Sequence, residues 1–60
     1  MDNFAIGSKV WWWERNKETG KTFPRRGVIH SFSEHRVKVK TDGTIILREI
    51  SKLRIDDRNS

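Results

Sequence analysis

The 60-residue sequence predicts an all-β domain, a small barrel of five short strands with one short helical turn before the last strand. Apolar residues alternate with polar ones or form short runs, a pattern typical of strands. Four glycines interrupt the chain, and no segment keeps a helical apolar stripe over three turns. A chain of this length has too few strands to form two separate sheets. Closure of one sheet into a barrel therefore gives the expected single core.

The first half of the chain predicts one long hairpin. A turn at Ile6-Gly7-Ser8 leads into a first strand at residues 9–14. Residues 16–21 are polar and contain a glycine, so they are expected to form an exposed loop. The second strand is expected at residues 23–32, with Pro24 near its start, where a missing N–H is tolerated at a sheet edge.

The second half predicts three shorter strands. The expected elements are a turn at 33–35, a third strand at 36–40, a fourth strand at 44–48, a helical turn at 51–53 and a last strand at 54–55. The third strand alternates basic and apolar residues, so Val37 and Val39 should face the core and the cations should face outward. Asp42-Gly43 is the strongest two-residue hairpin signal in the chain.

One barrel is expected over residues 4–56, followed by a frayed tail at 57–60 that carries no hydrophobic residue. Phe4 and Ile6 are expected to seal one end of the core. The predicted core itself consists of Val10, Trp12, Ile29, Val37, Val39, Ile45, Leu47 and Leu53.

Composition narrows the function classes. The chain has no cysteine, 13 Lys and Arg against 8 Asp and Glu, and a net charge of +5. A domain this small cannot enclose a deep cleft, and no nucleophile–base pair, phosphate cradle or metal-ligand spacing appears, so we expect no enzyme activity and no cofactor. No run is long and apolar enough to span a bilayer. The absence of cysteine favours a reducing compartment, so we expect a cytoplasmic protein, or a nucleoid or nuclear one if it binds DNA.

The positive charge is concentrated in one part of the sequence. Residues 15–40 carry eight Lys and Arg against two Glu, whereas the rest of the chain has a net charge of −1. Pairing of the second and third strands would place these cations beside one another, which is mildly destabilising unless an anion compensates. The alternatives are a surface for nucleic acid or another polyanion, and a solvated face that discourages aggregation.

Three consecutive tryptophans mark the first strand. Strand alternation sends Trp12 inward and therefore sends Trp11 and Trp13 outward. These outer rings either pack under the first loop or against the last strand, or they form a platform on which bases stack, at about 1–3 kcal/mol per base.

The order of these elements resembles the SH3-like barrel superfamily, which includes Tudor, KOW, retroviral integrase C-terminal and myosin N-terminal modules. The segments that carry the resemblance are Gly7-Ser8-Lys9-Val10-Trp11, Arg26-Gly27-Val28-Ile29, Val37-Lys38-Val39, Asp42-Gly43 and Ile50–Leu53. In local sequence, Val10-Trp11 and Pro24-Arg25-Arg26-Gly27 are similar to segments of the integrase C-terminal barrel. The G-x-x-V-W sequence at the start of the domain is similar to that of the myosin barrel. The resemblance implies a fold and a binding module, but it does not specify a ligand, since such modules bind DNA, RNA, methylated tails or neighbouring domains.

The sequence therefore predicts a basic module that binds the phosphates of DNA or RNA with little sequence preference. The expected phosphate contacts are Lys17, Lys21, Arg25, Arg26, Arg36, Lys38 and Lys40, with Trp11 or Trp13 stacking on a base or sugar. The alternative is a protein-interaction module that docks on an acidic partner or self-assembles through exposed tryptophan. We expect a monomer or weak homodimer and no membrane partner.

Overall fold

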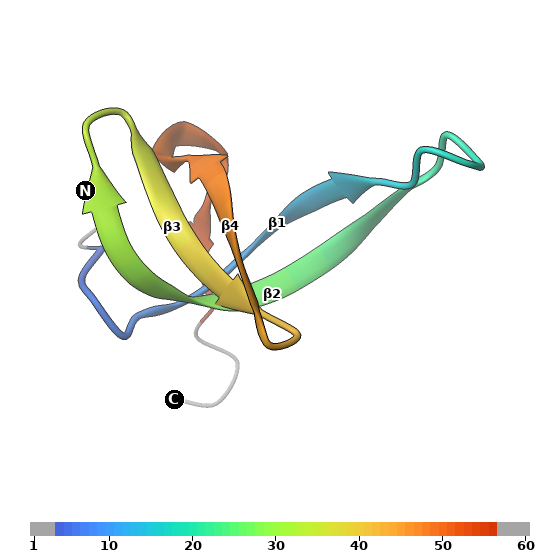
Figure 1. Ribbon diagram of the computed structural model, residues 1–60. Helices are drawn as coiled ribbons and strands as arrows, with labels where there is room; N and C mark the ends of the chain where they lie inside the picture. Colours follow the sequence, from blue (N-terminus) through green and yellow to red (C-terminus); the bar gives the residue numbers. More distant parts are fainter. Residues whose placement is uncertain (1–3, 57–60) are drawn as a thin grey trace.

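Five antiparallel strands form one sheet in the computed structural model, which describes residues 4–56 (Figure 1). The elements are β1 (Lys9–Arg15), β2 (Thr22–Ser33), β3 (Arg36–Thr41), β4 (Thr44–Glu49), the 3₁₀ turn η1 (Ile50–Lys52) and β5 (Arg54–Ile55). The all-β class, the five strands and the single helical turn before the last strand are confirmed. The expected frayed tail lies outside the described residues.

Strand β2 organises the sheet because it is long enough to pair with two partners. Its first part pairs with β1, from Thr22 to Val28, and its last part pairs with β3, from Val28 to Ser33. The register shifts between Ile29 and Ser31, so His30 is an extra residue in β2 and the strand is irregular there. The tip of the β1–β2 hairpin projects away from the β2–β3 turn, at the opposite side of the molecule (Figure 1).

The strand order is β4-β3-β2-β1-β5, so β4 and β5 are the two edges of the sheet. Between them, within residues 4–56, no hydrogen-bonded ladder closes the barrel. The sheet curls around its core instead (Figure 1). The β3–β4 turn is tight: Asp42 has φ +52° and Gly43 has φ +74°. Two positive φ values identify the type I′ turn that Asp-Gly favours.

The core lies inside this curl and is small. Its buried side chains are Val10, Trp12, Ile29, Val37, Val39 and Leu53. Six of the eight predicted core residues are therefore confirmed. Phe4 packs against this cluster as expected. Thr41 is also buried, and its hydroxyl donates a hydrogen bond of 2.7 Å to the carbonyl oxygen of Arg26.

The remaining core predictions are wrong. Ile45 and Leu47 are each 46% exposed, and the partly buried Ile46 packs on the core in their place. The reason is register: Val39 faces inward and is paired with Ile46, so the residues on either side of Ile46 must face outward. Ile6, predicted to seal one end of the core, is 69% exposed in the turn before β1.

Candidate nucleic-acid interface

Trp11 and Trp13 lie on the outer side of β1, as strand alternation predicted. Their ring centroids are 5.6 Å apart and their planes meet at 80°, an edge-to-face pair. Trp13 is 58% exposed, whereas Trp11 is half-buried. The pair therefore presents one exposed ring, Trp13, in contact with a half-buried one, Trp11.

Two arginines flank Trp11. The register places Arg26 of β2 on one side of Trp11 and Arg54 of β5 on the other. The guanidinium carbon of Arg54 lies 5.9 Å from the centroid of the Trp11 ring, a cation–π contact. Arg26 Nε lies 3.7 Å from an oxygen of Asp56, a long ion pair that leaves the side chain half exposed. Trp11, Trp13, Arg26 and Arg54 are called the Trp face below.

A shallow groove of about 330 Å³ adjoins the Trp face. Lys9, Arg26 and Lys40 bring three cations to its wall, and Asp42 and Asp56 bring two carboxylates. Cross-strand pairing explains the convergence, because Val28 of β2 is opposite both Lys9 and Lys40. The three cations allow the groove to hold an anion beside Val28.

Sequence reasoning did not single out Lys9 or Arg54 as functional residues. Both lie outside residues 15–40, where positive charge is concentrated along the chain. The available signal was the pairing of the last strand with the first, which sets Arg54 opposite Trp11. The position of Lys9, two residues before Trp11 on the same face of β1, was a second signal.

Lys17 and Lys21 lie at the tip of the β1–β2 hairpin, in the expected loop. The loop is ordered by its own hydrogen bonds: the side-chain oxygen of Asn16 accepts from the backbone N–H of Glu18 at 2.8 Å and of Thr19 at 3.3 Å. Backbone bonds also join Asn16 to Lys21 and to Gly20. These two lysines, called the basic tip below, are therefore displayed on a defined turn.

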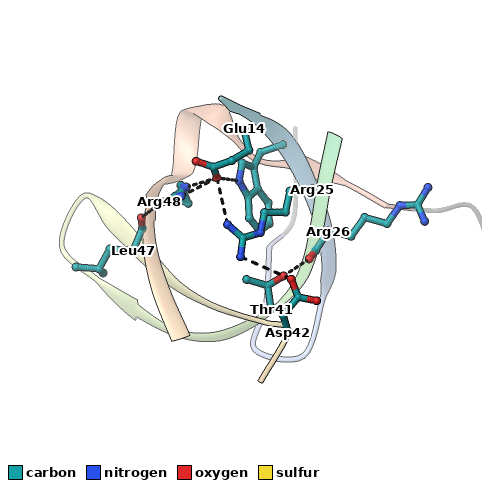
Figure 2. Close-up of polar contacts among 8 residues, drawn as sticks. Glu14, Arg25, Arg26, Thr41, Asp42, Leu47 and Arg48 are labelled. Atoms are coloured by element: carbon teal, nitrogen blue, oxygen red, sulfur yellow. Dashed lines mark hydrogen bonds and ion pairs between the residues drawn. The ribbon is translucent and has the colours of Figure 1, made fainter. Parts of the chain in front are cut away.

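Arg25 has a different environment from the other predicted phosphate contacts. Its register partner is Trp12, so it lies on the inner side of the sheet. One nitrogen of Arg25 is 3.8 Å from Glu14 and another is 3.7 Å from Asp42 (Figure 2). Arg26 extends away from this cluster in the same view. Arg25 is thus engaged by two carboxylates within the domain.

Glu14 is the centre of this ion cluster. Its Oε1 accepts hydrogen bonds from Trp12 Nε1 at 2.8 Å and from Arg48 Nη2 at 2.6 Å (Figure 2). Arg48 also lies over the Trp12 ring, 6.0 Å from its centroid. The cluster covers the edge of the largest core residue, so its role in the structure is to hold Trp12 in place.

The surroundings of Glu14 lower its pKa. Burial of the carboxyl acts in the opposite direction and is the largest single influence, but it is outweighed by hydrogen bonds from Trp12 and Arg48 and by the charges of Arg48 and Arg25. Glu14 is therefore a carboxylate in the folded protein at neutral pH.

This pKa makes stability depend on acid pH. A folded pKa below the ordinary value of 4.5 stabilises the fold above pH 4.5, and the contribution is lost as pH falls through the folded pKa. We expect Glu14→Gln to lower the free energy of unfolding by about 1–2 kcal/mol at pH 7, through lost charged hydrogen bonds. The difference from the wild type should shrink below pH 4. Urea unfolding at pH 7, 5 and 3 measures it, with the exposed Glu18→Gln as control. A constant difference at all three values would contradict the role assigned to Glu14.

Arg36, Lys38 and Lys40 are exposed on the outer side of β3, as predicted. Lys40 reaches the groove beside the Trp face, whereas Arg36 lies at the other end of β3, next to the β2–β3 turn. The cations that are concentrated in the sequence are therefore distributed over separate regions: the Trp face with its groove, the outer side of β3, the basic tip and the ion cluster.

Across residues 4–56, no three His, Asp or Glu side chains gather as metal ligands would. The described part of the chain also contains no helix long and apolar enough to cross a membrane.

Comparison of the chain with protein-family models, with curated proteins and with solved structures gives no match. The resemblance to SH3-like barrels therefore stays a prediction from the residues that carry it, and the candidate function is argued from the geometry of this chain.

Proposed function

We propose that this domain binds single-stranded nucleic acid, DNA or RNA, with bases stacked on the Trp face and phosphates held by the surrounding cations. The observation that carries the proposal is Trp13, a large ring 58% exposed beside Trp11, which itself lies between Arg26 of β2 and Arg54 of β5. Every base has a π face, so such a platform binds without sequence preference.

The cations around the rings support a path for the sugar–phosphate backbone. Arg26 and Arg54 lie on either side of Trp11, and Lys9 and Lys40 continue the positive surface into the groove. The basic tip lies farther along the same hairpin. Reading of base edges in a duplex is not part of the proposal, because the only helical element in residues 4–56 is the three-residue η1.

Removal of the exposed ring tests the stacking. Trp13→Ala should weaken binding of a labelled mixed-sequence 20-nucleotide strand by about fivefold to 150-fold, from the roughly 1–3 kcal/mol of one stacked base. Fluorescence anisotropy at 50 mM salt measures the affinity. Leu47→Ser, an exposed apolar residue on a different part of the sheet, is the matched control and should bind like the wild type. Equal affinity of Trp13→Ala and the wild type would overturn the proposal.

Salt dependence tests the phosphate contacts separately. If Lys17 and Lys21 each neutralise one phosphate, the double variant Lys17→Gln/Lys21→Gln should reduce the slope of log affinity against log salt by about 1.4, at about 0.7 per contact. The same titration between 50 and 300 mM salt gives the slope. An unchanged slope would remove the basic tip from the interface. A stable dimer without affinity for any strand would instead favour self-assembly through the tryptophans.

A further inference from the structure

A second exposed surface lies on the outer side of β3 and β4. It consists of Lys38 and Lys40 on β3 with Ile45 and Leu47 on β4, and it is called the β3–β4 face here. Val28 of β2 extends it beyond Lys40. We infer that the β3–β4 face docks an acidic protein segment that carries aliphatic side chains.

The register makes the face a set of adjacent basic–aliphatic pairs. Lys40 is opposite Ile45, and Lys38 is opposite Leu47. Thr41 and Thr44 flank the two-residue turn, so they form a hydrogen-bonded pair. Hydrogen-bonded and non-hydrogen-bonded pairs alternate along an antiparallel ladder, so Lys40–Ile45 and Lys38–Leu47 are both non-hydrogen-bonded pairs. Side chains are closest in such pairs, so each aliphatic side chain lies directly against a lysine stem.

The aliphatic side chains of this face are not needed by the core. Ile46 is the β4 residue that packs on the buried cluster, whereas Ile45 and Leu47 point to solvent with 46% exposure each. Val28 adds a third aliphatic side chain at 39% exposure. Strand β4 thus carries apolar side chains on both sides, although only the side with Ile46 packs on the core. Neighbouring exposed apolar residues are characteristic of interaction surfaces.

The free edge of β4 is a poorer docking site than its face. Since Lys38 and Leu47 are a non-hydrogen-bonded pair, the Leu47 carbonyl points away from β3. Arg48 already donates to that carbonyl oxygen through Nη1 at 2.6 Å. An added strand would have to displace this bond, whereas the outward side chains are open.

The positive charge of Lys38 and Lys40 favours an acidic partner. Glu14 and Asp42 form their ion pairs with Arg25 and Arg48 rather than with Lys38 or Lys40, although the two lysines are neighbours on one side of β3. A partner with carboxylates would relieve their repulsion, and its aliphatic side chains would cover Ile45 and Leu47. A nucleic acid satisfies the lysines alone, because phosphates gain nothing from an aliphatic stripe, and this favours a protein segment.

Selection from a random dodecapeptide library displayed on phage tests the inference with the whole chain as bait. The enriched peptides should combine Asp or Glu with Leu, Ile or Val. A synthetic copy of the most enriched peptide should lose at least tenfold in affinity for Ile45→Ser/Leu47→Ser and for Lys38→Gln/Lys40→Gln. Trp13→Ala should bind that peptide like the wild type.

Several results would overturn the inference. These are a library that yields no enriched peptide, enriched peptides without acidic and aliphatic residues, and unchanged affinity in the lysine variant, which keeps every core side chain. Loss of peptide binding in Trp13→Ala would overturn it too. The inference does not depend on the proposed function, although Lys40 belongs both to the β3–β4 face and to the groove beside the Trp face. If peptides fail while strands still bind, only the β3–β4 face is refuted, and the reverse result refutes only the Trp face.

Discussion

Replacing Trp12 with alanine is expected to unfold the domain at 25 °C. Trp12 is the largest fully buried side chain in the described structure, 1% exposed. Truncation of a buried tryptophan lowers the free energy of unfolding by about 3–5 kcal/mol. A 60-residue domain has a total of only about 3–9 kcal/mol at roughly 0.05–0.15 kcal/mol per residue. The variant also removes the hydrogen bond to Glu14.

Circular dichroism and thermal unfolding measure this effect, and the neighbouring residue supplies the control. Trp13→Ala deletes the same side chain from an exposed position one residue away, so it should leave the free energy of unfolding within about 1 kcal/mol of the wild type. A cooperative transition in Trp12→Ala at the wild-type temperature would contradict the central place of this ring in the core.

Gly27→Ala is expected to lower the free energy of unfolding by about 3 kcal/mol, the upper part of the range for overpacked cores. A Cβ at this position would lie 2.5 Å from Val39 Cγ1 and 2.8 Å from the backbone oxygen of Lys40. The side chain of Trp12 is a third neighbour, at 3.2 Å. Because one obstacle is backbone, rotation of a side chain cannot make room, and β2 and β3 must separate.

Urea unfolding of Gly27→Ala should be compared with Gly20→Ala in the hairpin tip. A Cβ at Gly20 meets nothing within 4 Å, but its φ of +76° strains any other residue. The control should therefore lose about 1 kcal/mol, through backbone strain alone. An equal decrease in the free energy of unfolding in the two variants would contradict the close packing of β2 against β3 at Gly27.

The sequence analysis did not predict correctly which side chains of β4 face the core. Thr44, Ile45, Ile46 and Leu47 contain three consecutive apolar residues, so alternation alone cannot decide which of them face inward. The signal was nevertheless present. A two-residue turn at Asp42-Gly43 pairs Thr41 with Thr44, and counting outward pairs the inward-facing Val39 with Ile46. The local turn type, combined with one buried partner, fixes the register.

The cross-strand partner of Arg25 could not be predicted from a turn in the same way. The β1–β2 hairpin has a six-residue tip, and a loop of that length does not fix the register of its strands. Only the folded hairpin sets Arg25 opposite Trp12, where it joins Glu14. Alternation did suffice to place Trp12 inside and Trp11 and Trp13 outside, and to turn Arg36, Lys38 and Lys40 outward.

The indole N–H signals of the three tryptophans provide the most direct test of the Trp face. In a titration of ¹⁵N-labelled, unmutated protein with a mixed-sequence single strand, the Trp13 and Trp11 signals should shift progressively as bases stack nearby. The Trp12 signal should stay in place, since its N–H is held by Glu14 and its ring is buried. Three signals that do not move, or shifts confined to the amides of β3 and β4, would contradict the proposal that this surface binds nucleic acid.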